Sequence, residues 1–179
     1  MVDLEVRGVW LTLDDSNVLK SETNIREALT KLKSHGFNTI YPAVWHSGHT
    51  LYHSQVAENF MGVAVKPDKD FEDRKLMEEL VKVSKEQDFR LIPWFEFGLM
   101  VPPNSPIDKL EDKDPSKFKD LITRTKDGGK IRIKEDDLGQ LMRDDSGKLV
   151  PDDFVWMNPC HPEVQNFMVE LIGVKVAKS

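Results

Sequence analysis

The sequence has almost no cysteine, because Cys160 is the only one among 179 residues. A single thiol excludes an intramolecular disulfide and every zinc site built from several cysteines. Long apolar runs are also missing, since no stretch approaches the roughly 20 residues that span a bilayer. Residues 1–5 lack a basic region followed by an apolar run. The sequence as written therefore predicts a cytoplasmic protein without a membrane span.

An excess of positive charge is absent as well. The chain has 25 lysines and arginines against 31 aspartates and glutamates, which gives a net charge of -6. Surfaces that bind phosphate backbones are rich in lysine and arginine, so nucleic acid is not an expected partner. No G-x-G-x-x-G, Walker or G-x-S-x-G pattern occurs. Nucleotide-dependent and serine-hydrolase functions lose their usual support, and we expect no cofactor.

The chain does contain an alternation of strand-like and helix-like segments. Its 39% of hydrophobic residues is enough to form the core of one domain, which we predict over residues 1–179. Four short segments rich in β-branched and aromatic residues predict strands. They cover residues 4–13, 37–45, 89–97 and 155–157. Pro42 and Pro93 are unusual in central strands, but each lies near the C-terminal end of its segment, so we retain both strands.

Spacings of three and four residues predict helices between these strands. The first has Ser21 or Thr23 as its N-terminal cap and Gly36 as the left-handed residue at its end. The second begins near Asp70 and the third at Pro162. The positions that define the three inner faces are Ile25, Ala28, Leu29 and Leu32; Leu76, Met77, Leu80, Val81 and Ser84; and Val164, Phe167, Met168, Leu171 and Ile172.

Residues 100–153 are polar and rich in turn signals, with one predicted helix at about residues 115–125. A connection of this length is either a functional lid or binding segment or an irregular excursion. The alternation of strands and helices implies a parallel sheet with right-handed crossovers, in an open sheet or a barrel. A complete (β/α)8 barrel needs about 250 residues. We therefore predict an α/β fold that is the N-terminal half of a TIM barrel, truncated after about four strand-helix units.

Reactive groups are expected where the strands end, at their C-terminal edge. Strand alternation places Trp94 and Glu96 on one face, so the carboxylate points into a pocket beside an indole. An apolar wall disfavours an ionised carboxylate, which suits general-acid work. The alternative is a structural ion pair between Glu96 and Arg7. Glycoside hydrolysis usually needs two carboxylates. Asp14 or Asp15 could supply the second, although a turn is the favoured interpretation of that segment.

The loop after the second strand contains three histidines, His46, His49 and His53, whose spacing could suit a metal ion. They have no helical frame and no cysteine or glutamate beside them, so we expect no metal site. Trp45 and Tyr52 in the same segment fit stacking on a sugar ring, and they fit hydrophobic packing nearly as well.

Four motifs occur in order along the chain, at residues 7–11 (RGVWL), 37–45 (FNTIYPAVW), 93–98 (PWFEFG) and 156–164 (WMNPCHPEV). Together they resemble one family, the bacterial glycosyl hydrolase-like barrels that include the denuded-peptidoglycan glucosaminidase. The resemblance runs from about residue 6 to residue 172, and residues 173–179 form a divergent tail. It implies a (β/α)8 barrel that hydrolyses O-glycosidic bonds in a polysaccharide such as the glycan strands of peptidoglycan.

The resemblance also implies which residues lie at the substrate cleft. Glu96 would support catalysis or act as the acid, and the substrate-binding residues would be Arg7, Trp45, Asn158 and His161. Trp94, placed beside Glu96 by strand alternation, is a further predicted substrate-binding residue. In the family, the helix that begins at His161 runs on to a strand ending in paired aspartates. This sequence ends first, so we expect the chain to lack the main catalytic carboxylates and its activity to be doubtful.

Two departures from the family are the divergent tail and the missing export signal, since members are often exported or lipid-anchored. A truncated gene, a frameshift or an excised fragment would explain both. Alternative functions are therefore a non-catalytic glycan-binding half, a half-barrel that self-associates through its open sheet edges, and a gene remnant without function.

Overall fold

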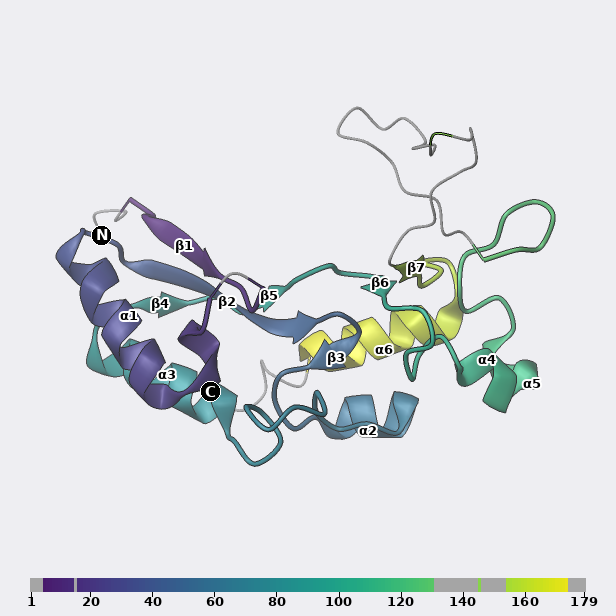
Figure 1. Cartoon of the computed structure of the whole chain (residues 1–179), viewed down its shortest axis with the longest axis horizontal. Helices are drawn as coiled ribbons and strands as arrows, with labels where there is room; N and C mark the ends of the chain where they lie inside the picture. Colours follow the sequence, from purple (N-terminus) through teal and green to yellow (C-terminus); the bar gives the residue numbers. More distant parts are fainter. Residues whose placement is uncertain (1–4, 15, 131–144, 146–153, 174–179) are drawn as a thin grey trace. The chain divides into compact units, whose positions relative to one another are not determined.

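The computed structural model describes residues 5–14, 16–130, 145 and 154–173, shown in Figure 1. The chain divides into two compact units. Unit 1 comprises residues 1–58 and 63–98, and unit 2 comprises residues 59–62 and 99–179. Each unit has its own sheet, and they are described separately below.

Unit 1 is built on a parallel sheet whose central strand is β2 (Thr39–His46). Strand β1 (Gly8–Leu11) lies on one side of β2, in a register that pairs Gly8 with Thr39. Strands β4 (Arg90–Leu91) and β5 (Trp94–Phe95) pair with β2 on its other side. The two-residue strand β3 (His49–Thr50) folds back antiparallel on the end of β2.

The predicted third strand is interrupted rather than continuous. Ile92 and Pro93 separate β4 from β5, because proline has no N–H to donate to the neighbouring strand. The register against β2 also shifts between Ala43 and Trp45. The strand therefore ends at Phe95, one residue before Glu96.

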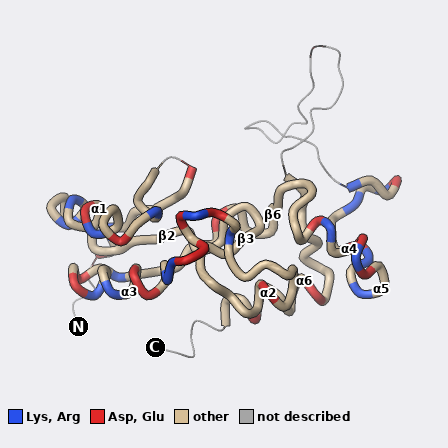
Figure 2. The backbone as a smooth tube through the Cα atoms, turned by 60° about the horizontal axis from the view of Figure 1, so that its bottom comes forward, with Lys and Arg blue, Asp and Glu red and all other residues tan. Residues whose placement is uncertain are grey.

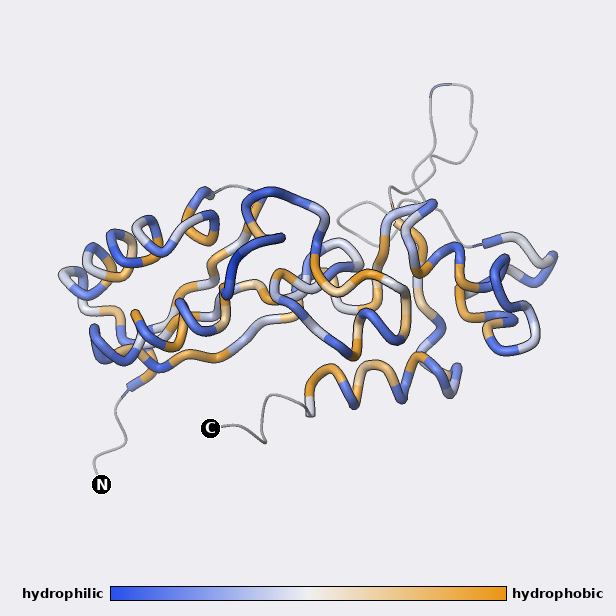
Figure 3. Tube along the Cα trace, turned by 90° about the horizontal axis from the view of Figure 1, so that it is seen from below, coloured by the Kyte–Doolittle hydropathy of each residue, from blue (hydrophilic) through white to orange (hydrophobic). Residues whose placement is uncertain are grey.

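Two crossover helices pack on the sheet of unit 1, α1 (Glu22–Ser34) after the short helix η1 (Val18–Lys20), and α3 (Leu76–Glu86). Ser21, not Thr23, caps α1, since its Oγ accepts a hydrogen bond from Asn24 N at 3.0 Å. Gly36 has the predicted left-handed φ of +83°. Apolar side chains of both helices share one core with the strands, including Leu29, Ile40 and Leu80. Figure 3 shows hydrophobic and hydrophilic residues alternating along the turns of the helices.

The second helix begins six residues later than predicted. Residues 69–73 form turns, in which Asp68 Oδ1 accepts from Asp70 N and Phe71 is buried. Arg74 fixes this segment by donating from its guanidinium to the carbonyls of Leu19 and Asp70. Along the outer surface, acidic and basic residues are interspersed on α1 and α3 (Figure 2), and Arg26 pairs with both Glu22 and Glu86.

Unit 2 contains an antiparallel pair of strands, β6 (Met100–Val101) and β7 (Val155–Trp156), and the helices α4 (Leu110–Lys113), α5 (Pro115–Phe118) and α6 (Pro162–Gly173). The boundary between the units falls within α2 (Gln55–Met61). Within unit 2, Phe60 stacks on Phe167 with ring centroids 4.1 Å apart.

Four predictions for this region need correction or restriction. The helix predicted to reach residue 125 ends at Phe118, and Asp120 has a φ of +61°. Helix α6 begins at Pro162 as predicted, but Ile172 is 51% exposed because it lies beside the buried stripe of Val164, Phe167 and Leu171. The fourth predicted strand pairs with β6 rather than with the parallel sheet. Part of the predicted long loop, residues 131–144 and 146–153, lies outside the described residues.

The parallel sheet with its crossover helices confirms the predicted α/β fold class, that of a partial (β/α)8 barrel. Within the described ranges, no helix has the length and apolar character needed to cross a membrane.

Candidate functional site

The strand ends of unit 1 bring Asp14, His46 and Glu96 together. His46 is the last residue of β2, Asp14 follows β1, and Glu96 follows β5. Because these strands are parallel, their C-terminal ends meet at one edge of the sheet. His46 Nε2 lies 3.0 Å from Asp14 Oδ1 and 3.8 Å from Glu96 Oε2. One ligand atom from each residue lies within 4.8 Å of the others. We call these residues the Asp14–His46–Glu96 cluster.

Glu96 is fixed by Thr12, which follows β1, and by Trp45 of β2. Thr12 Oγ1 donates to Glu96 Oε1 at 2.6 Å, and the Glu96 backbone N–H donates to the Trp45 carbonyl at 3.1 Å. The residue is 7% exposed, yet its second carboxylate oxygen, Oε2, has no hydrogen-bond partner among the described residues. A buried carboxylate with one oxygen tethered and the other free is positioned to receive a ligand or a proton.

His46 and Asp14 differ in their access to solvent. His46 is 5% exposed, its ring meets Phe97 edge-on at 5.2 Å, and its Nδ1 has no hydrogen-bond partner in the described part of the chain. The Asp14 side chain is 55% exposed. After His46, Ser47 and Gly48 both have positive φ, which turns the chain into β3. The cluster is therefore buried on the His46 and Glu96 side and open on the Asp14 side.

The cluster holds two carboxylates against one imidazole. Within the described ranges, neither Asp14 nor Glu96 forms an ion pair with a lysine or an arginine. The excess of acceptors can attract a cation, hold a proton, or accept hydrogen bonds from hydroxyl groups.

Arg7 does not join this cluster. It precedes β1, where its Nε donates to the Gly36 carbonyl at 2.5 Å and its guanidinium approaches Glu5 at 3.5 Å. The alternative prediction, an ion pair between Glu96 and Arg7, is therefore wrong. The role of Arg7 in substrate binding stays a prediction, and it lies at the opposite end of the strand from Glu96.

The two predicted tryptophans pack into unit 1. Trp45 is fully buried, and its Nε1 donates to the Gly98 carbonyl at 2.9 Å. Its ring therefore packs in the hydrophobic interior, which was the alternative to sugar stacking. Trp94 is partly buried against the core shared by the sheet and helices. Their contacts with substrate stay predictions.

Asn158 and His161 lie together in unit 2, at the start of α6. Asn158 accepts from the Cys160 N–H at 3.0 Å and donates to the Asp120 carbonyl at 3.2 Å. His161 Nε2 lies 3.1 Å from the Lys119 carbonyl, and its Nδ1 accepts from Glu163 N. The two side chains therefore join the loop after α5 to the helix start, and their predicted substrate roles remain predictions.

The three loop histidines do not form a common site. His49 Nδ1 lies 3.1 Å from the Ser47 carbonyl, whereas His53 Nε2 lies 2.5 Å from the Glu72 carbonyl. Burial lowers the pKa of His49, which keeps that ring neutral. Sequence reasoning grouped the histidines with one another and missed the grouping of His46 with Asp14 and Glu96. The available signal was that each of these three residues stands at the end of a predicted strand.

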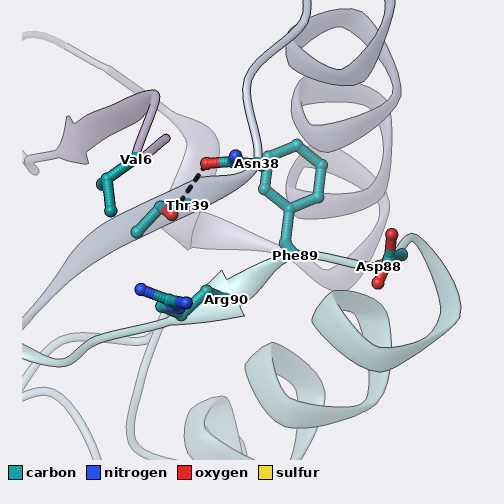
Figure 4. A pocket seen from close by; sticks show the side chains of 6 residues that line it. All are labelled: Val6, Asn38, Thr39, Asp88, Phe89 and Arg90. Atoms are coloured by element: carbon teal, nitrogen blue, oxygen red, sulfur yellow. Dashed lines mark hydrogen bonds between the residues drawn. The ribbon is translucent and has the colours of Figure 1, made fainter. Parts of the chain in front are cut away.

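A pocket of about 290 Å³ lies at the other end of the strands (Figure 4). Its lining includes Asn38, Thr39 and Arg90. Thr39 Oγ1 donates to Asn38 Oδ1 at 2.9 Å, so these two polar groups satisfy each other. The pocket lies away from the predicted reactive edge and is lined by no member of the cluster.

The family model described as glycosyl hydrolase-like 10 matches residues 5–178. A comparison with curated proteins finds no match.

Three solved structures share the fold. A hypothetical protein from Ruminiclostridium thermocellum is 15% identical, with a TM-score of 0.55 over 90% of this chain and 68% of its own. An alpha-galactosidase from Thermus thermophilus in complex with stachyose is 14% identical, with a TM-score of 0.56 over 96% of this chain and 30% of its own. Trehalose-6-phosphate hydrolase from Bacillus licheniformis is 12% identical, with a TM-score of 0.57 over 97% of this chain and 33% of its own. The chain thus spans about a third of each of these two hydrolases.

Proposed function

The chain belongs to the glycosyl hydrolase-like 10 family, and from that premise we propose that it forms part of a carbohydrate cleft at the C-terminal edge of its parallel sheet. The observation that carries the proposal is the Asp14–His46–Glu96 cluster at that edge. Reactive and binding groups of barrel enzymes come from this end of the strands. The proposed ligand is a polysaccharide, such as the glycan strands of peptidoglycan.

The geometry favours a supporting role for Glu96. Paired glycosidase carboxylates flank the bond they cleave and stand about 5 Å or more apart, with the sugar between them. Here the imidazole of His46 contacts Asp14 and approaches Glu96. A ring in that position occupies space that a scissile bond would need. We therefore propose that Glu96 positions substrate hydroxyl groups and that the main catalytic carboxylates are not in this cluster.

The test is glycan binding measured by titration calorimetry on the full chain, with peptide-free peptidoglycan strands as the probe. Glu96→Gln keeps the side-chain volume and the acceptor for Thr12 but removes the charge. We expect the variant to bind the glycan at least about 10-fold more weakly, since a charge-assisted hydrogen bond is lost. Glu78→Gln is the matched control, because Glu78 is a 71% exposed carboxylate on α3.

Release of reducing ends from the same glycan separates binding from hydrolysis. Binding without release supports the supporting role of Glu96. Release that Glu96→Gln abolishes would assign it the acid role instead. Equal affinities of Glu96→Gln and the unmodified chain, or no binding by either, would contradict a glycan site at the cluster.

A second candidate function is self-association through the sheet edges. Among the described residues of unit 1, β1 and β4 each pair only with β2. Trp10 on β1 is 58% exposed and stacks on Tyr41. An unpaired strand edge with exposed aromatic surface is suited to contact with another copy. Sedimentation velocity at two concentrations tests it, and a single monomer species at both would contradict it.

A further inference from the structure

We propose that the Asp14–His46–Glu96 cluster binds one divalent transition-metal ion, with Zn²⁺ as the best candidate. The proposal stands on the geometry of the three side chains and does not depend on the glycan function. From the sequence we expected no metal site, because only the three loop histidines were considered as ligands.

The spacing of the three groups suits a single ion. Bonds of about 2.1 Å to a tetrahedral metal place its ligand atoms about 3.4 Å from one another. His46 Nε2 lies 3.0 Å from Asp14 Oδ1 and 3.8 Å from Glu96 Oε2, values on either side of that separation. The Asp14 side chain is more than half exposed and can adjust to complete the triangle.

The second observation is the free carboxylate oxygen inside the cluster. Glu96 Oε2 is buried and has no hydrogen-bond partner among the described residues. His46 Nε2 lies 3.8 Å away, beyond hydrogen-bond distance. Buried polar atoms normally form hydrogen bonds, so one that forms none points to a ligand. The other oxygen, Oε1, accepts from Thr12, and this contact fixes the direction in which Oε2 points. Hydrogen-bonded carboxylates of this kind are typical of metal ligands held by outer partners.

The donor types decide which ion fits. One imidazole nitrogen with two carboxylate oxygens is a mixed set that suits Zn²⁺ or Mn²⁺ better than Mg²⁺ or Ca²⁺, which prefer oxygen alone. Between the first two, a given site binds Zn²⁺ more tightly. Two carboxylates without a lysine or arginine partner in the described ranges also leave a net negative charge that the ion would balance.

The experiment is titration of the metal-stripped full chain with Zn²⁺ by calorimetry, in the absence of any glycan. We expect one ion per chain, with weaker binding of Mn²⁺ and weaker still of Ca²⁺. Asp14→Asn and Glu96→Gln each remove one charged ligand and should weaken Zn²⁺ binding by at least about 100-fold, since loss of an outer partner alone costs 10–100-fold. His49→Ala is the matched control, because it removes a neighbouring imidazole outside the cluster.

Two outcomes would overturn the proposal: a folded chain that does not bind Zn²⁺, or Asp14→Asn and Glu96→Gln variants that bind it as tightly as the unmodified chain. Binding lost in His49→Ala but kept in Asp14→Asn would place the ion elsewhere and also overturn it. Far-ultraviolet circular dichroism of each variant checks folding, and the exposed position of Asp14 makes Asp14→Asn the variant least able to disturb the core. Because no glycan is present, failure here leaves the glycan proposal standing.

Discussion

Tyr52 shows how burial alone changes the chemistry of one side chain. Burial raises the pKa of its phenol to about 12, and a hydrogen bond with Ser54 opposes part of that shift. The folded chain therefore holds this proton more tightly than the unfolded chain, where a tyrosine titrates near 10. The contribution of Tyr52 to stability is constant below about pH 10 and falls as the pH rises from about 10 to about 12.

The chain has two tyrosines, so Tyr41→Phe leaves Tyr52 as the single phenol. We expect the phenolate absorbance of this variant to appear with a midpoint near pH 12 in the folded chain and near pH 10 in urea. The same midpoint under both conditions would show that Tyr52 is not buried as described. Circular dichroism at each pH identifies the folded range.

Gly8 sets how closely β1 approaches the aromatic ring of Tyr41 on β2. A Cβ at this position would lie 2.5 Å from Tyr41 Cε2. That ring is held against Trp10, with centroids 4.7 Å apart and planes at 16°. A methyl group at residue 8 must therefore displace the stacked pair or the strand itself.

We expect Gly8→Ala to lower the free energy of unfolding by about 1–3 kcal/mol, the usual cost of overpacking, as measured by urea denaturation. Gly173→Ala is the control, since a Cβ at the end of α6 meets nothing within 4 Å. The cost of Gly8→Ala should shrink when Tyr41 is replaced by alanine, because the clash is then removed. An equal cost in both backgrounds would contradict the close approach.

The elements predicted best from the sequence are those governed by local rules. Ser21 caps helix α1 and the left-handed Gly36 follows its last turn, as predicted, because both effects act within a few residues. The predicted start of the second helix near Asp70 was wrong, because Arg74 and the buried Phe71 stabilise turns there through contacts distant in sequence. The local sequence pattern carries no information about contacts between residues that are distant in sequence.

The candidate site was predictable in part for the same reason. Glu96 and Asp14 could be named from their places at the ends of predicted strands, and the structure adds Thr12 and His46 around Glu96. Thr12 and Asp14 follow β1 and His46 ends β2, and only the strand register brings them to one edge. The pairing of Trp156 with Met100 was beyond sequence reasoning, since nothing local distinguishes an antiparallel partner from a fourth parallel one.

For the whole molecule, alternation of strands and helices was enough to predict the α/β class, and the family match over residues 5–178 agrees with the resemblance of its motifs. The two units differ in what they contribute. Unit 1 carries the complete cluster, whereas unit 2 carries Asn158 and His161 in contacts of its own. We therefore propose that unit 1 holds the ligand-binding site.

The most direct test of that claim is nuclear magnetic resonance of the histidine rings during titration with the peptide-free glycan, with a chelator present to remove metal ions. The chain has five histidines, and His35 at the end of α1 serves as the internal control. We expect saturable shifts of the His46 ring signals, unchanged His35 signals, and loss of the His46 response in Glu96→Gln. A glycan that binds while the His46 signals stay unchanged would contradict a site at the Asp14–His46–Glu96 cluster.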